Sequence, residues 1–350
     1  MAETETYDAP AEPRPAVHET EGLAGRLGLR ALDYRIPADA NRWNYMLGGL
    51  TAFLITILFL TGFYLAQFYQ PNPVGARDSV IYIITRAPLG DWIRSIHYWS
   101  AAGLAVTLAA HLGFVFWRRS YRKPREFTWW AGVALAGLIF LMIVTGSALR
   151  NDEEGFEALA HFVAGGKMTS AIGGGFFTEA FTTSTTLLSR IFTLHTSLIP
   201  LALVALMGLH FWLIKHLGIH ADASRTTIFR THLLRLTGAG LLVFAGIGLL
   251  AAVAPEGIGY PAVPGNEVTK PFWPVLWVYG LENILGMWGM VLGPAVLGGF
   301  LFAVPLLDRS KDDRPGIRGA VGWAGVAVAV TVLGFWLYGV FGAAQQHMGM

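Results

Sequence analysis

The stretch HYWSAAGLAVTLAAH, residues 97–111, places a histidine at each end of thirteen mostly small and apolar residues. On an α-helix, the fourteen positions from His97 to His111 correspond to a rise of about 21 Å and bring both side chains onto nearly the same face. A second apolar stretch, IFTLHTSLIPLALVALMGLH at residues 191–210, separates His195 from His210 by fifteen positions, or about 22 Å. The sequence therefore predicts two helices that each carry two histidines at matching separations.

The composition is that of a membrane protein, because 54% of the 350 residues are hydrophobic and only 14% are charged. Apolar stretches of about 20 residues are long enough to cross the hydrocarbon core as helices. Pro200 is expected to kink the fourth of them. We expect an all-α membrane protein with seven transmembrane helices, at residues 45–68, 97–117, 128–149, 191–214, 236–254, 276–305 and 319–341.

Lysine and arginine are distributed unevenly between the alternate loops of this arrangement. Eighteen of the 25 lie in the N-terminal arm and in residues 118–126, 215–235 and 309–318, and seven lie in the other loops. The positive-inside rule then places the N-terminus in the cytoplasm and the C-terminus outside, in a multi-pass protein of a bacterial or archaeal cytoplasmic membrane. The second and fourth spans run the same way, so His97 is level with His195 near the outer side and His111 with His210 near the inner side.

The spans divide the chain into a cytoplasmic arm (1–43), a four-helix bundle with the histidines (44–217) and three C-terminal helices (218–350). Within the arm, residues 22–33 fit either a helix in the membrane interface or an ordinary solvated segment. The outer segments 150–190 and 255–275 are expected to form short helices on the surface. The first forty residues show no signal-peptide pattern.

Missing or sparse residue types exclude several classes of protein. With no cysteine, this chain can hold no disulfide, no iron–sulfur cluster and no haem tethered through thioethers. A net charge of +2, dispersed over the loops, gives no reason to expect a nucleic-acid partner. Any cofactor is expected to be held non-covalently by histidine, methionine or carboxylates.

Two histidines that face each other across a four-helix core offer the axial ligation of a low-spin b haem. A zinc ion would need three or four ligands close together, which these separated pairs cannot supply. A single intramembrane histidine is more often a polar contact, but two matched pairs indicate two b-type haems.

Glycines with the same period would let backbones approach the haem rings, and arginines could neutralise the haem propionates. The expected cofactor-binding residues are His97, His195, His111 and His210 as ligands of haem iron, with Gly48, Gly62, Gly132, Gly146, Arg94 and Arg119 around them.

Six motifs carry a resemblance to a known family: LGGLTAFLITILFLTGF (47–63), IRSIHYWSA (93–101), AAHLGFVFWRRSYRKPREFTWWAG (109–132), SRIFTLH (189–195), LGP (292–294) and PLLDR (305–309). They resemble the cytochrome b family of the Rieske/cytochrome b quinol-oxidising complexes, over residues 35–341. The histidine spacing and the seven spans are most similar to a single-chain fusion of the plastid-type cytochrome b and its subunit four.

The resemblance implies a function. His97 and His195 would ligate an outer, lower-potential haem, and His111 and His210 an inner, higher-potential one. Quinol oxidised at an outer site would send one electron to a Rieske iron–sulfur protein and the other through the two haems to quinone at an inner site. A c-type cytochrome or other acceptor subunit, a homodimer and a respiratory or photosynthetic chain are implied with it.

The sequence departs from the family at three places. Met46 stands where the plastid-type protein attaches an extra haem through cysteine, so that attachment is excluded. The family has Leu-Pro-Trp after the third span, where this chain has LRN (149–151). The family's Pro-Glu-Trp-Tyr motif, whose glutamate is thought to accept a quinol proton, is replaced, so that the expected quinol-pocket residues are Pro271, Phe272, Trp273 and Pro274, with Tyr279 beyond them.

Quinol oxidation would need another proton acceptor, because Phe272 cannot act as a base. Glu282 is the one carboxylate inside a predicted span, and an intramembrane acid is a candidate for function. Asp152 belongs with Glu153 and Glu154 to the altered loop, where the alternative is a solvated acidic cluster. The candidate catalytic residues are therefore Glu282 and Asp152.

Three functional hypotheses remain. The leading one is a dihaem cytochrome b subunit of a quinol:acceptor oxidoreductase. The alternative is a transmembrane electron conduit docked to another oxidoreductase, such as a nitrate reductase or hydrogenase module, without quinol bifurcation. A third is a transporter or assembly protein whose histidines are only polar contacts, which a b-type absorption band would exclude.

Overall fold

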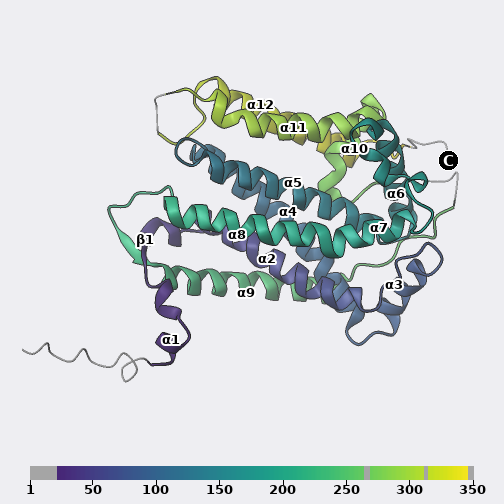
Figure 1. Ribbon diagram of the computed structural model, residues 1–350, viewed down its shortest axis with the longest axis horizontal. Helices are drawn as coiled ribbons and strands as arrows, with labels where there is room; N and C mark the ends of the chain where they lie inside the picture. The colour runs from purple at the N-terminus through teal and green to yellow at the C-terminus, as the bar shows by residue number, and fades with distance from the viewer. Residues whose placement is uncertain (1–21, 264–268, 311–313, 346–350) are drawn as a thin grey trace, which may run out of the picture.

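Long helices that lie side by side form the body of the molecule (Figure 1). The computed structural model describes residues 22–263, 269–310 and 314–345. Within these residues, seven helical segments are long and apolar enough to cross a membrane, which confirms the expected all-α membrane fold. They are α2 (Trp43–Ala66), α4 (Gly90–Trp117), α5 (Glu126–Ala148), the run from α7 (Leu187–Thr193) to α8 (Ile199–Leu217), α9 (Phe229–Val253), α11 (Met287–Leu307) and α12 (Gly319–Phe341).

Short elements lie at the two ends of the bundle. One end, on the right in Figure 1, carries α3 (Ala76–Thr85), α6 (Glu153–Met168) and α10 (Leu276–Leu285), together with the short turns η3 (Ser170–Ile172), η4 (Gly174–Phe177), η5 (Glu179–Phe181) and η7 (Trp273–Val275). The other end carries η2 (Ala38–Asn41) and an antiparallel pair of strands, β1 (Arg35–Pro37) and β2 (Thr226–Ile228), in which Arg35 pairs with Ile228. The short helices expected in 150–190 are present, whereas the described residues of 255–275 form only the short turn η7 at their end.

The N-terminal segment 22–33 is not one helix. The helix α1 (Leu23–Arg26) has four residues and is separated from η1 (Leu29–Leu32) by Gly28, whose φ is 68°. Glycine adopts this left-handed conformation without strain, and the chain turns there. The interfacial helix considered from the sequence is therefore reduced to two short turns.

The sixth predicted span, 276–305, is wrong in one respect, because it consists of two helices. The chain breaks at Gly286, with φ 61° and ψ −158°, between α10 and α11. This is a region of backbone conformation that glycine reaches easily and other residues rarely do. Glu282 accordingly lies on the short helix α10, outside the seven candidate spans, and not inside a span as expected from the sequence.

Close packing joins α10 to α12. A Cβ on Gly280 would lie 2.2 Å from the backbone oxygen of Phe335, and a Cβ on Gly339 would lie 2.4 Å from the backbone oxygen of Leu276. The two helices can approach this closely only because both glycines lack a side chain. The pair fixes the segment 271–275, which directly precedes α10.

The helix α11 is joined to α5 through two tryptophans. Pro305 has no N–H, so the carbonyl of Leu301, four residues earlier, lacks its usual helical donor. The indole of Trp129 donates to that carbonyl at 2.7 Å, and the indole of Trp130 donates to the next carbonyl, of Phe302, at 2.9 Å. The C-terminal helices are thus attached to the bundle by two indole hydrogen bonds, one of them to the carbonyl that the proline leaves without a donor.

Pro200 also disturbs its helix, as expected. It lies in the first turn of α8, directly after the π-helical turn η6 (Leu194–Leu198), which contains His195. Because proline cannot donate to the preceding turn, a widened turn at this position avoids an interior helix hydrogen bond that it could not make. His195 therefore projects from an irregular turn and not from regular α-helix.

The main core fills the middle of the bundle. The helices α2 and α4 pack together, as do α5 and α8, and α9 lies along α4. Leu104 lies seven positions from both His97 and His111. The buried apolar residues around it are Leu54, Ile55, Ile96, Ile139, Ile199, Leu203, Ile247 and Ala251. An apolar layer therefore separates the levels of the two histidine pairs.

Candidate functional site

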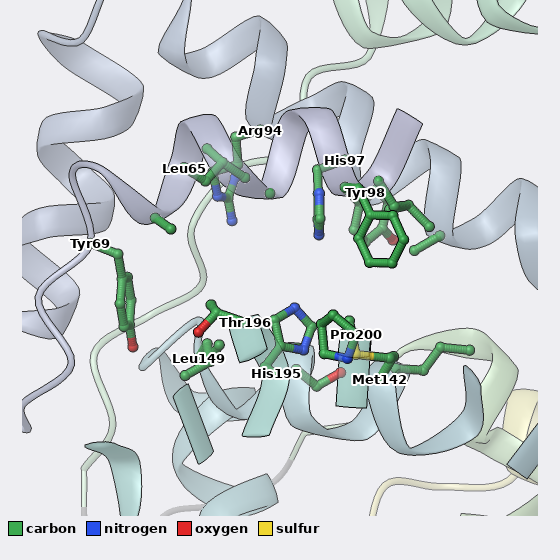
Figure 2. A pocket seen from close by; sticks show the side chains of 18 of the residues that line it. Leu65, Tyr69, Arg94, His97, Tyr98, Met142, Leu149, His195, Thr196 and Pro200 are labelled. Atoms are coloured by element: carbon green, nitrogen blue, oxygen red, sulfur yellow. The ribbon is translucent and has the colours of Figure 1, made fainter. Parts of the chain in front are cut away.

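His97 of α4 and His195 of η6 face each other across the bundle, as Figure 2 shows. Their ring centroids lie 6.4 Å apart. A metal ion bonded at about 2 Å to one nitrogen of each imidazole would hold the two rings roughly 6 Å apart. The separation therefore fits one iron atom between the two rings.

A threonine hydroxyl sets the orientation of each ring. Oγ1 of Thr61 lies 2.9 Å from Nδ1 of His97, and Oγ1 of Thr145 lies 2.9 Å from Nδ1 of His195. Each hydroxyl donates its own proton to a carbonyl of its own helix at 2.7 Å. The oxygen is then free to accept the Nδ1–H of the imidazole, which leaves Nε2 as the neutral nitrogen that a metal requires.

Two glycines face the same pair of rings. A Cβ on Gly62 of α2 would lie 3.3 Å from Cε1 of His97, and a Cβ on Gly146 of α5 would lie 3.0 Å from Cε1 of His195. Thr61 directly precedes Gly62 and Thr145 directly precedes Gly146. The repeated Thr-Gly dipeptide is a signal that could have identified the two threonines, which were not predicted.

The other pair of histidines has the same construction. His111 and His210 lie near each other. A Cβ on Gly48 of α2 would lie 2.8 Å from Cε1 of His111, and a Cβ on Gly132 of α5 would lie 3.4 Å from Cε1 of His210. The structure thus brings the four predicted histidines and the four predicted glycines together in two sets. Each set has two histidines and two glycines, as their common sequence period indicated.

A cavity of about 560 Å³ opens beside His97 and His195. Cofactor and ligand pockets usually measure about 300–1,000 Å³. The lining is mainly apolar within the bundle and becomes polar towards the end that carries α6. The residues there that matter for the site are Arg94, Tyr98, Arg150, Glu256 and Phe272.

The two arginines expected near haem propionates differ in position. Arg94 lines the cavity and donates to backbone carbonyls of residues 256–257. Arg119 is 3% exposed and binds both carboxylate oxygens of Asp308, at 2.9 and 2.7 Å, while the Tyr121 hydroxyl donates to Asp308 at 2.8 Å. The guanidinium of Arg119 is thus bound to the PLLDR motif, and its place beside a propionate stays a prediction.

Four charged side chains form a cluster at the mouth of the cavity, which we call the Arg150 cluster. Nη1 of Arg150 lies 2.9 Å from Oε1 of Glu256 and 3.2 Å from Oε2 of Glu154. Nε and Nη2 of Arg150 donate to Oδ2 of Asp152 at 3.1 and 2.9 Å. This cluster was not predicted, because its members come from segments about a hundred residues apart.

Asp152, a predicted catalytic residue, has a structural role. Its carboxylate is completely buried, caps α6 by accepting the N–H of Gly155 at 3.1 Å and accepts the N–H of Gly259 at 2.8 Å. Burial would raise the pKa of Asp152, but the Arg150 guanidinium and the two backbone N–H groups outweigh it and hold the pKa below its usual value. A carboxylate stabilised in this way is a poor proton acceptor, so the structure does not favour Asp152 as the catalytic base.

Glu282, the other predicted catalytic residue, lies behind the site. It is 4% exposed, and its carboxylate lies 3.0 Å from Nε2 of His161, whose Nδ1 lies 2.7 Å from the carbonyl oxygen of Glu157. Burial would lower the pKa of His161, but the bond and charge of Glu282 and the carbonyl of Glu157 raise it overall. The His161–Glu282 pair joins α6 to α10, and a catalytic role for Glu282 stays a prediction.

Only one of the expected quinol-pocket residues reaches the cavity, among the residues that the structure describes. Phe272 lines it, and its ring centroid lies 5.0 Å from that of Tyr98. Tyr279 is buried away from the cavity, where its hydroxyl accepts the N–H of Gln345 at 2.8 Å. The remaining members of the expected set are outside the lining: Pro271, Trp273 and Pro274.

Comparisons with known proteins agree with this arrangement. The sequence pattern of the family described as Cytochrome b/b6/petB matches residues 31–218. Cytochrome b6 of Prochlorococcus marinus (strain MIT 9211) is 35% identical over 188 residues, which cover 53% of this chain and 85% of that protein. Cytochrome b6 of Synechococcus sp. (strain JA-3-3Ab) is 36% identical over 192 residues, 53% of this chain and 86% of that protein.

The fold is similar over a longer part of the chain. A solved structure described as a hyperthermophilic respiratory Complex III has a TM-score of 0.72 at 20% sequence identity, over 90% of this chain and 96% of that chain. The family match ends at residue 218, just after α8, so α9, α11 and α12 lie beyond it. With no cysteine, any b haem on this chain is bound non-covalently. The chain therefore belongs to the cytochrome b/b6 family, as a membrane-embedded electron-transfer subunit of an oxidoreductase with three additional C-terminal membrane helices.

Proposed function

We propose that this chain is the dihaem cytochrome b subunit of a quinol-oxidising complex. The observation that carries the proposal is the repeated set of two facing histidines and two glycines, at two levels about 21 Å apart along the bundle. One set opens into a cavity that extends to Phe272 and the Arg150 cluster. Each haem, when bound, supplies reversible one-electron chemistry.

The residues of the chain hold and separate the two groups. His97 and His195 would bind one iron, and His111 and His210 the other. Thr61 and Thr145 fix the tautomers at the first level. Gly48, Gly62, Gly132 and Gly146 leave room beside the rings, and Arg94 is placed for a propionate.

We place the His97 end at the outer side of a bacterial or archaeal cytoplasmic membrane, with the N-terminus in the cytoplasm and the C-terminus outside. The distribution of basic residues supports this orientation, because residues 118–125, at the other end, contain five of the 25 lysines and arginines. Quinol would be oxidised at the cavity mouth, and quinone would be reduced at the His111 end.

The partners follow from the one-electron chemistry. A Rieske iron–sulfur protein would take the other electron of quinol and pass it to a c-type cytochrome or another acceptor. The similarity to a Complex III structure supports this assembly, and a homodimer is the expected form. Residues 44–217 would act as the haem-binding bundle, and residues 218–350 would complete the quinol pocket.

Haem content tests the proposal first. We expect two non-covalent b haems per purified chain, and one each in the His97→Ala and His111→Ala variants, measured from pyridine haemochrome and reduced-minus-oxidised spectra. A single haem in the unmodified chain would contradict the dihaem arrangement.

Stopped-flow haem reduction by quinol then separates the two candidate functions. Quinol oxidation at the cavity predicts rapid reduction that is blocked by an inhibitor of the outer site. Reduction that proceeds only from the His111 end would favour an electron conduit docked to another oxidoreductase.

A further inference from the structure

Glu154 is the acid of the Arg150 cluster that lies against Phe272. Its Oε1 accepts the backbone N–H of Phe272 at 3.0 Å, and Phe272 lines the cavity. Glu154 comes from the first turn of α6, whereas Phe272 precedes α10, more than a hundred residues later. A carboxylate from another segment therefore lies beside the position at which this chain has phenylalanine.

The cluster contains more negative than positive charge. Arg150 binds three carboxylates, those of Asp152, Glu154 and Glu256, and one guanidinium can balance only one of them. Arg94 lies close enough to interact electrostatically with Arg150, Glu256 and Asp152, and it adds a second positive charge. The cluster still has one negative charge in excess, so one carboxylate can gain a proton at low cost.

Glu154 is the member best suited to gain that proton. Asp152 is held ionised by four donors, and Glu256 has the shorter contact with Arg150, 2.9 Å against 3.2 Å. Burial raises the pKa of Glu154, and the charges of Asp152 and Glu256 add to this effect. The opposing influence of Arg150 and of the Phe272 N–H does not cancel it, so the pKa of Glu154 lies above its usual value.

Glu154 also has a path by which it can release a proton to solvent. The side chain of Glu154 is 15% exposed, so it is neither sealed in the core nor fully in solvent. A general base is most effective when its pKa approaches the working pH, and it must reach its substrate directly or through one water molecule. Glu154 meets the first condition by its burial. Its carboxylate does not line the cavity but contacts Phe272 and Arg150, which do, so the proton would reach it through one water molecule.

We propose that Glu154 accepts the hydroxyl proton of quinol bound in the cavity, and this inference rests on the proposed function. The O–H bond of quinol breaks and a carboxyl O–H bond forms on Glu154, while the second quinol proton goes to water. Of the two electrons that leave quinol, one would go to a ferric haem held by His97 and His195 and the other to the iron–sulfur acceptor. Glu154 then releases its proton to the adjacent solvent and is ready for the next turnover.

The test compares Glu154→Gln with Glu153→Gln, its neighbour in the same helical turn. Glutamine keeps an oxygen for the Phe272 N–H, so Glu154→Gln is expected to keep its haem spectrum, its thermal unfolding temperature and its binding of an outer-site inhibitor. We expect haem reduction by quinol to slow by roughly 10²–10⁴-fold, the range for loss of a general base, and to lose its pH dependence. Glu153→Gln should behave like the unmodified chain.

An infrared pH titration of the oxidised protein, without quinol, provides a second readout. The carbonyl band of a protonated carboxylic acid should be present in the unmodified chain and in Glu153→Gln and absent in Glu154→Gln. A full rate and an intact band in Glu154→Gln would overturn the inference, as would loss of both in Glu256→Gln alone. If quinol fails to reduce the unmodified chain through the cavity, the proposed function itself fails.

Discussion

A glycine lies against an imidazole at four places in the bundle, and the tightest of these contacts leaves no room for a methyl group. At the scale of single residues, the cofactor site therefore depends on glycines that lack a Cβ as much as on the histidine ligands. The histidines could be predicted from spacing alone, because fourteen helical positions return to one face. The threonines that hold them were not predicted, although the Thr-Gly dipeptide that recurs at residues 61–62 and 145–146 marks both of them.

The contact of Gly48 with His111 yields a direct test. In Gly48→Ala the new Cβ would lie 2.8 Å from Cε1 of His111, so the ring must move and the haem at this level should be bound less tightly. We expect a lower haem-to-protein ratio in pyridine haemochrome assays. Gly137→Ala, where nothing lies within 4 Å of the added Cβ, is the control and should keep both haems. Equal ratios in the two variants would contradict the assignment.

The buried carboxylate of Asp152 should matter for stability. Asp152→Asn leaves donors of Arg150, Gly155 and Gly259 without a charged acceptor and should lower the free energy of unfolding by about 3 kcal/mol. Thermal unfolding in detergent measures the loss, with Glu153→Gln as the control. Unchanged stability with a large loss of turnover would instead indicate a catalytic role for Asp152.

At the scale of elements, α10 connects the cavity to the C-terminal helices. It packs against α12 through Gly280 and Gly339, and against α6 through the His161–Glu282 pair. The apolar runs predicted the spans well, because a membrane helix needs only length and hydrophobicity. They could not predict the break at Gly286, since one glycine among the 42 of this chain does not signal a positive φ.

The crossing of α10 and α12 should tolerate no methyl group at Gly280. The Cβ of Gly280→Ala would lie 2.2 Å from the backbone oxygen of Phe335, so the helices must separate at a cost of about 2–3 kcal/mol. We expect a lower unfolding temperature and weaker binding of an outer-site inhibitor. Gly334→Ala on α12, with nothing within 4 Å, should leave both unchanged. A similar loss in both variants would show that the crossing is not the cause.

The contact between α6 and α10 should depend on pH. Because the pKa of His161 is raised in the folded chain, its pairing with Glu282 stabilises the fold fully below the unfolded value of about 6.5. That stabilisation is lost as pH rises through the folded pKa of His161. Thermal unfolding across this window should show the decline, and Glu282→Gln should flatten it. An unaltered pH profile in Glu282→Gln would contradict the pairing.

At the scale of the whole molecule, the sequence predicted the fold class and the two levels of histidines. It did not predict the Arg150 cluster, because residues 150–154 and 256 meet only after the loops at one end have folded. For the same reason it did not predict that Asp152 binds Arg150 in this cluster or that Glu282 pairs with His161. Local patterns determine helices, whereas a site built from several loops depends on the tertiary arrangement.

The proposed orientation can be tested because the chain has no cysteine. Ser184 and Ser224 are exposed loop residues that lie on either side of the run from α7 to α8, and hence at opposite ends of the molecule. In intact cells, a membrane-impermeant maleimide should label Ser184→Cys and should label Ser224→Cys only after lysis. The opposite pattern would reverse the orientation.

The apolar layer around Leu104 also makes electron flow sensitive to voltage. An elementary charge that crosses the whole membrane exchanges about 2.3 kcal/mol per 100 mV with the field. The two histidine levels span about 21 Å of a hydrocarbon core of about 30 Å, so each electron meets about 1.6 kcal/mol per 100 mV. With the His97 end outside, an energised membrane, negative inside, therefore opposes electron transfer from the His97 level to the His111 level. The membrane potential that this transfer helps to build thus slows further transfer through the same bundle.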